Sequence, residues 1–297
     1  MNKFFILIIF FAFATNAFAQ RKYKAYKRPS PSNQEIGLSL GVSNYLGDLA
    51  WKGKIPIINE SNPKAFRPAG GVYYRSNFTK FTSFRASLGM GELTGTDAQT
   101  NNDPARVNRN LSFKSVVLEA SVMFEWNIAP YLIGDKKRPF TPYLGIGLAG
   151  FYFNPKAELN GRWVALQPLG TEGQGIIDGK SKYSNFQFAI PGAVGIKANL
   201  GKKFALGLEF QYRMTFTDYL DDVSSENFVS SDIFYDNYIT AVAADADALS
   251  YRAIDPAISP RETDQRGNPN NNDNYYFIFV NLSYKIGKKN DSCPTFR

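Results

Sequence analysis

The segment from Phe204 to Phe216 constrains the fold more than any other part of the chain. Large apolar residues occupy every second position, and small or polar residues, with Glu209 and Arg213 among them, stand between. In an extended strand this period of two places the large apolar side chains on one face. The 13 residues span about 43 Å, or about 30 Å when tilted by about 45°, which matches a hydrocarbon layer. The segment predicts a membrane-spanning β-strand.

Seven further segments carry the same alternation, although the phase of the second is not fixed by its pattern. They cover approximately 36–43, 68–77, 84–93, 117–126, 144–153, 188–198 and 276–286. The connections alternate in length. Long, irregular loops without a helical pattern occupy 46–67, 94–110, 154–183 and 217–274, and shorter turns occupy 77–80, 127–141 and 200–203. This asymmetry is typical of outer-membrane barrels, whose outer loops are long and whose periplasmic turns are short.

We therefore predict an all-β fold, an eight-stranded antiparallel transmembrane β-barrel of the outer-membrane type with long extracellular loops. An even strand count places both termini in the periplasm. Aromatic residues near the strand ends are expected to form the interfacial girdle; they are Tyr45, Trp126, Tyr143, Tyr152 and Phe216. Pro191 departs from the pattern, since proline weakens a ladder position.

The alternative is a soluble barrel of the lipocalin type with its apolar face turned inward. Alternation alone does not distinguish inside from outside. Two features favour the membrane barrel: the second face is rich in Gly, Ala and Ser, which suits a narrow lumen, and the strands are long with strictly alternating connections.

The N-terminal residues predict export. Lys3 precedes an apolar run from Phe4 to Phe13, and the small-residue pattern Ala17-Phe18-Ala19 follows. We expect a secretory signal peptide over 1–19, because the apolar run is too short for an uncleaved membrane helix. No Cys follows the cleavage site, so a lipoprotein anchor is not indicated. The predicted order is then a basic periplasmic tail (20–34), the outer-membrane barrel (35–287) and a periplasmic C-terminal tail (288–297).

Several charged residues fall on the inward face of the predicted strands. They are Arg85, Glu119, Glu125, Lys197, Glu209 and Arg213. Eight strands leave a lumen that side chains fill, and buried charges must be paired. We expect a structural ion network here rather than a conducting pore or a catalytic carboxylate pair. The chain contains no His, which excludes His-dependent triads and His-ligated catalytic zinc. We expect no enzyme activity, no cofactor and no small-molecule substrate.

Charge is segregated between the two predicted ends of the barrel. The periplasmic segments sum to +12, whereas the loop 217–274 carries twelve acids and three arginines, a net −9. A basic periplasmic rim is compatible with simple solvation, with anionic lipid headgroups or with an acidic periplasmic partner. Charge alone does not choose among these three. Nucleic acid is not expected in this compartment.

Three smaller features complete the inventory. Cys293 is the single cysteine and lies in a terminal tail, so intermolecular pairing is favoured over an ordinary thiol. Asp218, Asp221 and Asp222 lack the spacing of a Ca²⁺ loop and are expected to serve in caps and loop hydrogen bonds. The Gly-rich stretch at 170–179 lacks the Gly-Lys-Ser/Thr ending of a phosphate loop.

Five stretches resemble one known family. They are GLSLGVSNYLGDLA (37–50), RNLSFKS (109–115), YFNPKAELNGRWVALQPLGTEGQG (152–175), FTDYLDDVS (216–224) and CPTF (293–296). In these stretches the chain is similar to the PorG-type proteins, outer-membrane barrels of Bacteroidota associated with the type IX secretion system. The resemblance implies a barrel that acts with a periplasmic ring of a lipoprotein and its partner.

By that resemblance the basic periplasmic face and Cys293 become candidate contacts with the ring lipoprotein. The candidate residues are Arg21, Lys22, Lys24, Lys136, Lys137, Arg138, Lys202, Lys203 and Cys293. The family also includes relatives without an assigned role, so a free-standing structural or adhesin-like barrel is the alternative.

Overall fold

The computed structural model describes residues 34–50, 65–99, 103–225, 227–258, 260–261 and 264–286. The predicted signal peptide, residues 20–33 of the predicted N-terminal tail and the C-terminal tail, with Arg21, Lys22, Lys24 and Cys293, lie outside the described residues. Gln34, predicted as the last residue of the tail, begins the first strand.

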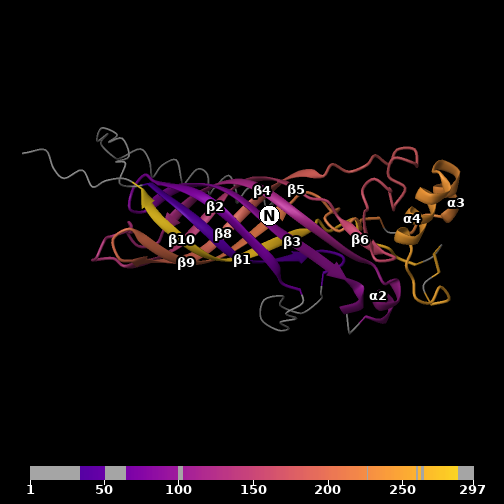
Figure 1. The fold of residues 1–297 in the computed structure, drawn as a ribbon, viewed down its shortest axis with the longest axis horizontal. Helices are drawn as coiled ribbons and strands as arrows, with labels where there is room; N and C mark the ends of the chain where they lie inside the picture. The colour runs from indigo at the N-terminus through magenta and orange to yellow at the C-terminus, as the bar shows by residue number, and fades with distance from the viewer. Residues whose placement is uncertain are drawn as a thin grey trace, which may run out of the picture. The chain divides into compact units, whose positions relative to one another are not determined.

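Eight long strands close into a barrel (Figure 1). They are β1 (Gln34–Leu46), β2 (Arg67–Asn77), β3 (Thr82–Thr96), β4 (Ser112–Asn127), β5 (Phe140–Tyr152), β8 (Phe186–Leu200), β9 (Phe204–Thr215) and β10 (Asn274–Ile286). Each strand pairs antiparallel with the next barrel strand in the chain, including β3 with β4. The first and last strands, β1 and β10, also pair, which closes the cylinder. The predicted fold class is confirmed.

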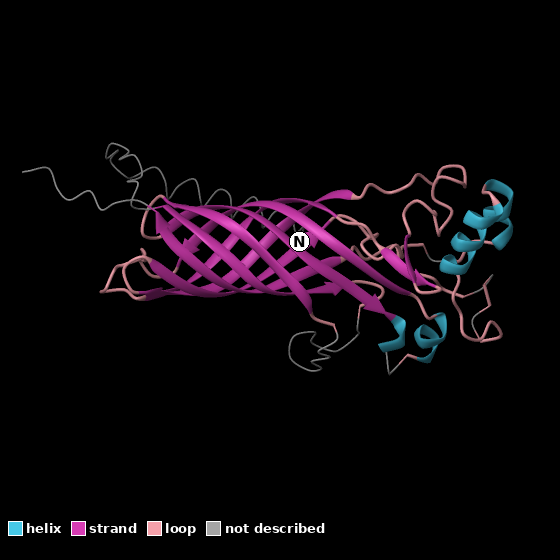
Figure 2. Cartoon of the chain, viewed as in Figure 1, coloured by secondary structure: helices cyan, strands magenta, loops and turns pink. Residues whose placement is uncertain are grey.

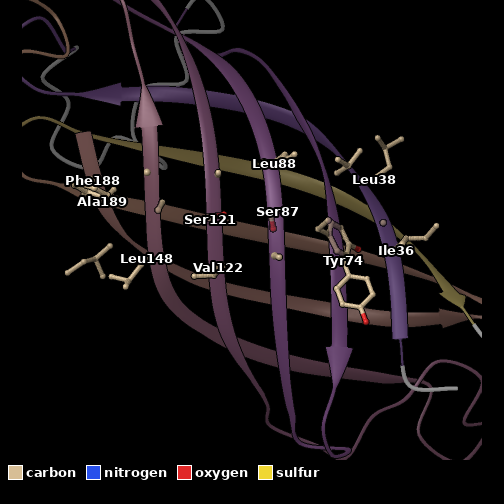
Figure 3. A pocket seen from close by; sticks show the side chains of 18 of the residues that line it. Ile36, Leu38, Tyr74, Ser87, Leu88, Ser121, Val122, Leu148, Phe188 and Ala189 are labelled. Atoms are coloured by element: carbon tan, nitrogen blue, oxygen red, sulfur yellow. The ribbon is translucent and has the colours of Figure 1, made fainter. Parts of the chain in front are cut away.

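Strand β4 shows how the sequence sets the two faces. From Phe113 onward its side chains alternate between the interior and the outer wall. Leu118, Val122 and Trp126 are about half exposed, at 50%, 43% and 53%. The same rule operates around the wall: the large apolar residues labelled in Figure 3, such as Leu38, Leu88 and Val122, come from different strands and lie on the outer surface. An apolar belt facing outward requires hydrocarbon around it, so the barrel is of the transmembrane type.

The structure fixes the phase of β2, which its sequence left open. Val72 and Tyr74 are exposed, and Tyr73 and Arg75 are buried in the lumen. Gly37 makes room for this arrangement, since a Cβ at that position would lie 2.1 Å from the Tyr73 ring. The ladder between β5 and β8 is interrupted opposite Pro191, as expected for a residue without an N–H.

The predicted aromatic girdle is wrong at two of its five residues. Tyr45 and Tyr143 are buried, with 2% and 1% exposure, because both occupy inward-pointing positions of their strands. Proximity to a strand end was the wrong criterion; the face of the strand decides. Trp126, Tyr152 and Phe216 are exposed as a girdle requires.

The long connections also differ from the prediction of irregular loops. They contain η2 (Asp97–Gln99), α2 (Pro104–Arg109), α3 (Ser231–Asn237), α4 (Thr240–Ser250) and a hairpin of β6 (Lys156–Leu159) and β7 (Arg162–Ala165). These helices are too short to display a clear 3.6-residue period, which is why the sequence did not show them. No helix among the described residues is long and apolar enough to cross a membrane.

All these additional elements gather beyond one end of the barrel, which we call the cap (Figure 2). The connections at the opposite end are short, and Gln34 and Ile286 lie there too. The predicted alternation of long and short connections therefore holds in space.

Candidate functional site

The barrel interior is organised around Glu125, which is fully buried. Its carboxylate lies 2.9 Å from Nε of Arg75, 3.1 Å from Nε of Arg85 and 3.1 Å from Nζ of Lys197. Three neighbouring strands and β8 supply these groups. Arg75 also reaches Glu35 at 2.8 Å. The single negative charge of Glu125 is thus shared by three cations, and other carboxylates supply the remaining negative charge.

A second group of contacts continues the network toward the cap. Arg85 pairs with Glu209 at 2.6 Å, and Arg213 pairs with Glu119 at 2.7 Å. The hydroxyl of Tyr275 donates to Glu119 at 2.9 Å. Within the described part of the barrel, the buried charges are four cations (Arg75, Arg85, Lys197, Arg213) and four carboxylates (Glu35, Glu119, Glu125, Glu209).

The six lumen residues expected from the sequence therefore lie together in the interior. Glu35 and Arg75 are two members that sequence reasoning missed. For Arg75 the phase of β2 was not readable, and Glu35 stands at the very start of the first strand. For Glu35 the alternation of its neighbours carries the missing signal: Ile36 and Leu38 point outward, so Glu35 points inward.

The lumen is packed rather than open. A cavity beside Arg85 and Arg213 has a volume of about 20 Å³, enough for about one water molecule. Salt bridges and aromatic side chains fill the rest of the cross-section, including Tyr143, whose ring lies 4.5 Å from Nζ of Lys197. This geometry supports a rigid, sealed barrel.

The turn after β4 seals the end opposite the cap. Tyr131 and Ile133 fold back into the mouth and are 1% and 2% exposed, packed with Ala205. Nδ2 of Asn199 donates to the carbonyl of Leu132 at 3.3 Å, and Nζ of Lys285 donates to that of Ile133 at 3.2 Å. The mouth is thus closed by an apolar plug tied to the barrel wall.

Five of the candidate partner-binding residues sit on this mouth. Lys136, Lys137 and Arg138 follow the plug, and Lys202 and Lys203 form the turn between β8 and β9; all five are exposed. The two turns pack closely, because Gly134, with φ of +90°, lets the chain approach the carbonyl of Lys202. The structure therefore brings five cations from two turns to one surface.

The cap is held by buried carboxylates. Asp221 accepts hydrogen bonds from the Tyr45 hydroxyl at 2.6 Å and from the amides of Leu49 and Val223. Asp222 accepts from Thr171 and Tyr183. Burial raises the pKa of Asp221 to about 7 and that of Asp222 to about 7. Burial also raises the pKa of Asp218 to about 8.

Asp221 and Asp222 serve the loop hydrogen bonds expected of them, whereas both carboxylate oxygens of Asp218 are buried without a hydrogen-bond partner among the described residues. Among the described residues, no group of three or more acidic, His or Cys side chains is placed to hold a metal ion.

Two further ion clusters in the cap were not predicted. Glu172 pairs with Arg266, and its Oε1 also accepts from the amides of Ser224 and Ser225. Asp97 pairs with both Arg106 and Arg109. Loop charges have no periodic signal, so only three-dimensional contacts could identify these pairs.

Comparison with known proteins identifies the family of this chain. The family model described as a domain of unknown function, DUF6089, matches residues 24–238. The chain belongs to the DUF6089 family. The match includes seven of the eight barrel strands and ends before β10. No curated protein sequence is significantly similar to the chain.

Several solved structures resemble this DUF6089 protein at low identity. Neisserial surface protein A is 10% identical over 86% of this chain and 98% of its own, with a TM-score of 0.40. The attachment invasion locus protein Ail of Yersinia pestis, solved with the heparin analogue sucrose octasulfate, is 8% identical over 84% and 96%, with a TM-score of 0.38. OprG, an outer membrane protein from Pseudomonas aeruginosa, is 9% identical over 86% and 97%, with a TM-score of 0.36.

Proposed function

We propose that this protein is a non-enzymatic outer-membrane component of the type IX protein secretion system, which anchors or contacts a periplasmic ring complex. The observation that carries the proposal is the sealed lumen. A barrel filled by eight paired charges and closed by Tyr131 and Ile133 has little room for a solute, so it acts through its two ends. The motifs resembling PorG-type proteins direct the proposal to secretion.

The basic mouth supports contact with a periplasmic partner. Lys136, Lys137 and Arg138 are exposed beside Lys202 and Lys203, and a dense cationic surface favours an acidic protein partner through complementary charge. The ring lipoprotein is the proposed partner. Cys293, in the C-terminal tail, is the proposed site of a disulfide with it.

Deletion of the gene followed by measurement of secreted cargo tests the role. We expect cargo to accumulate in the periplasm, and normal secretion would refute the proposal. Co-purification from native outer membranes tests the contact. The charge-reversal variant K136E/K137E/R138E should lose the ring, whereas K180E/K182E, which changes two lysines of the cap, should retain it. A Cys293→Ser variant should lose a high-mass band on a non-reducing gel.

The cap favours a second candidate, a free-standing structural or adhesin-like barrel. Its loops form an open pocket of about 850 Å³ whose lining includes Tyr219, Ser225, Asn227 and Phe228. An ordered outward surface with mixed polar and aromatic lining suits recognition of an external ligand. Normal cargo secretion combined with reduced cell attachment in the deletion strain would favour this candidate.

A further inference from the structure

Strand β4 continues past the apolar belt on the cap side, and the first outward residue beyond the belt is Lys114. The outward positions from Val116 to Trp126 are all apolar. About ten residues span about 33 Å, or about 25 Å along the axis at a tilt of about 40°, which is the height of the apolar band of outer-membrane barrels. Lys114 therefore stands at the level of the lipid headgroups.

A second lysine lies directly opposite. Strand β6 pairs with β4 through Lys114 and Lys156, which are antiparallel partners and so project from the same face. Lys156 is exposed, and the Lys114 side chain is 40% exposed. Like charges directly opposite each other on adjacent strands destabilise the pairing. The sequence places this unfavourable pair where the hairpin joins the barrel.

Nearby acids compensate the two lysines incompletely. Nζ of Lys114 lies 3.1 Å from Glu92, but Glu92 is shared with Arg67 at 3.4 Å. Within the described residues Lys156 makes no ion pair, and Glu158, on the same face of β6, makes none with either lysine. Arg67 and Lys114 share the carboxylate of Glu92, and Lys156 adds a third cation, so this part of the cap keeps a net positive charge even when Glu158 is counted.

An exposed tryptophan completes the surface. Trp163 on β7 is 51% exposed, and Nζ of Lys114 lies 5.3 Å from its ring. Its register partner is Glu158, so the indole projects from the same face as the lysines. Tryptophan beside cationic side chains is the combination found at the headgroup level of membranes.

We propose that Lys114 and Lys156 bind the phosphate of an anionic lipid headgroup in the adjacent leaflet, with Trp163 in the interface beside it. The phosphate oxygens accept hydrogen bonds from both ammonium groups and remove their repulsion. A lipid is favoured over free phosphate because Val116, immediately below, and the indole offer apolar contact to the remainder of the molecule. The bound headgroup would also secure β6 against β4. This inference rests on the barrel's place in a membrane and not on its role in secretion.

Native mass spectrometry of the full-length protein in detergent, titrated with diphosphoryl lipid A, tests the proposal. Each lysine near an anionic membrane surface adds to the free energy of lipid binding, so we expect K114A/K156A to bind lipid A about 30-fold more weakly than the wild type. The matched control K180A/K182A, which removes two exposed lysines elsewhere in the cap, should bind as the wild type does. Inorganic phosphate should not displace the lipid, and monophosphoryl lipid A should bind more weakly than the diphosphoryl form.

Unchanged lipid binding by K114A/K156A would overturn the proposal. So would an equal loss in K180A/K182A, which would indicate non-specific charge, or full displacement by inorganic phosphate, which would indicate a free-anion site. The variant K156E serves if the double variant does not fold. It restores charge balance opposite Lys114, so the hairpin should remain paired while lipid binding falls; wild-type lipid affinity in K156E would also contradict the proposal.

Discussion

Replacement of Glu125 by alanine should be among the most damaging single changes in the barrel. The substitution removes the carboxylate that contacts Arg75, Arg85 and Lys197 in a site where all four side chains are at most 5% exposed. Two of the three cations retain another partner. Arg75 keeps Glu35 at 2.8 Å, and Arg85 keeps Glu209 at 2.6 Å. Lys197 keeps no carboxylate within the described residues.

The magnitude follows from this asymmetry. Removal of one member of a buried ion pair costs about 3–5 kcal/mol, chiefly because the remaining charge is left uncompensated. We expect E125A to lose about that much unfolding free energy. Lys197→Met should cost clearly less, since Glu125 would still face two arginines. The double variant E125A/K197M should recover part of the loss, because it removes the stranded charge together with its partner.

Urea-induced unfolding in lipid vesicles, followed by tryptophan fluorescence and by heat-modifiable migration on gels, measures these free energies. Glu158→Ala, which removes an exposed carboxylate, is the control and should leave stability unchanged. A loss below about 1 kcal/mol in E125A, the value typical of solvent-exposed pairs, would refute the reasoning, because it would mean that water fills the lumen. Equal losses in E125A and E125A/K197M would refute the role assigned to Lys197.

Three further predictions address other parts of the molecule. The pKa of Asp218 is raised to about 8 and that of Asp221 to about 7 by burial, so their contribution to cap stability is complete below about pH 4 and is lost as pH rises through about 7 to 8; limited proteolysis should cut the cap faster at alkaline pH, and a flat pH profile would contradict this. Gly37→Ala should cost about 1–3 kcal/mol by overpacking against Tyr73, whereas Gly192→Ala, with no atom within 4 Å of the added Cβ, should be tolerated; equal urea midpoints would show that Tyr73 yields. Tyr131→Gly with Ile133→Gly should loosen the plug at the basic mouth but leave planar-bilayer recordings silent, because the salt-bridge network still fills the lumen; large, stable current steps would show that the plug alone seals the barrel.

Much of the barrel could be predicted because apolar side chains recur at every second position of its strands. Leu118, Val122 and Trp126 on one face of β4, with Glu119 and Glu125 on the other, fix both the strand and the inward direction of the charges. Where alternation is weak the prediction stopped: β2 carries Val72, Tyr73, Tyr74 and Arg75 in succession, and its lumenal arginine could be assigned only from the paired strands.

The cap lies beyond such reasoning because its stability comes from contacts between residues distant in the chain. Asp221 accepts a hydrogen bond from the hydroxyl of Tyr45, and Glu172 forms an ion pair with Arg266. Neither contact leaves a local pattern in the sequence. Helix α4 likewise leaves no clear pattern in the sequence. Ala243, Ala246 and Leu249 are buried, but in an alanine-rich helix of eleven residues the sequence does not indicate which face packs against the rest of the cap.

Site-directed spin labelling in lipid vesicles tests the central claim, that the apolar sides of the eight strands face hydrocarbon. Single cysteines at Leu88, Val122 and Leu148, in a Cys293→Ser background, would carry the labels. The account predicts strong relaxation of these labels by oxygen and weak relaxation by a water-soluble nickel chelate, with Ser121 in the lumen shielded from both. Ready access of the nickel chelate to Leu88, Val122 and Leu148 would contradict it.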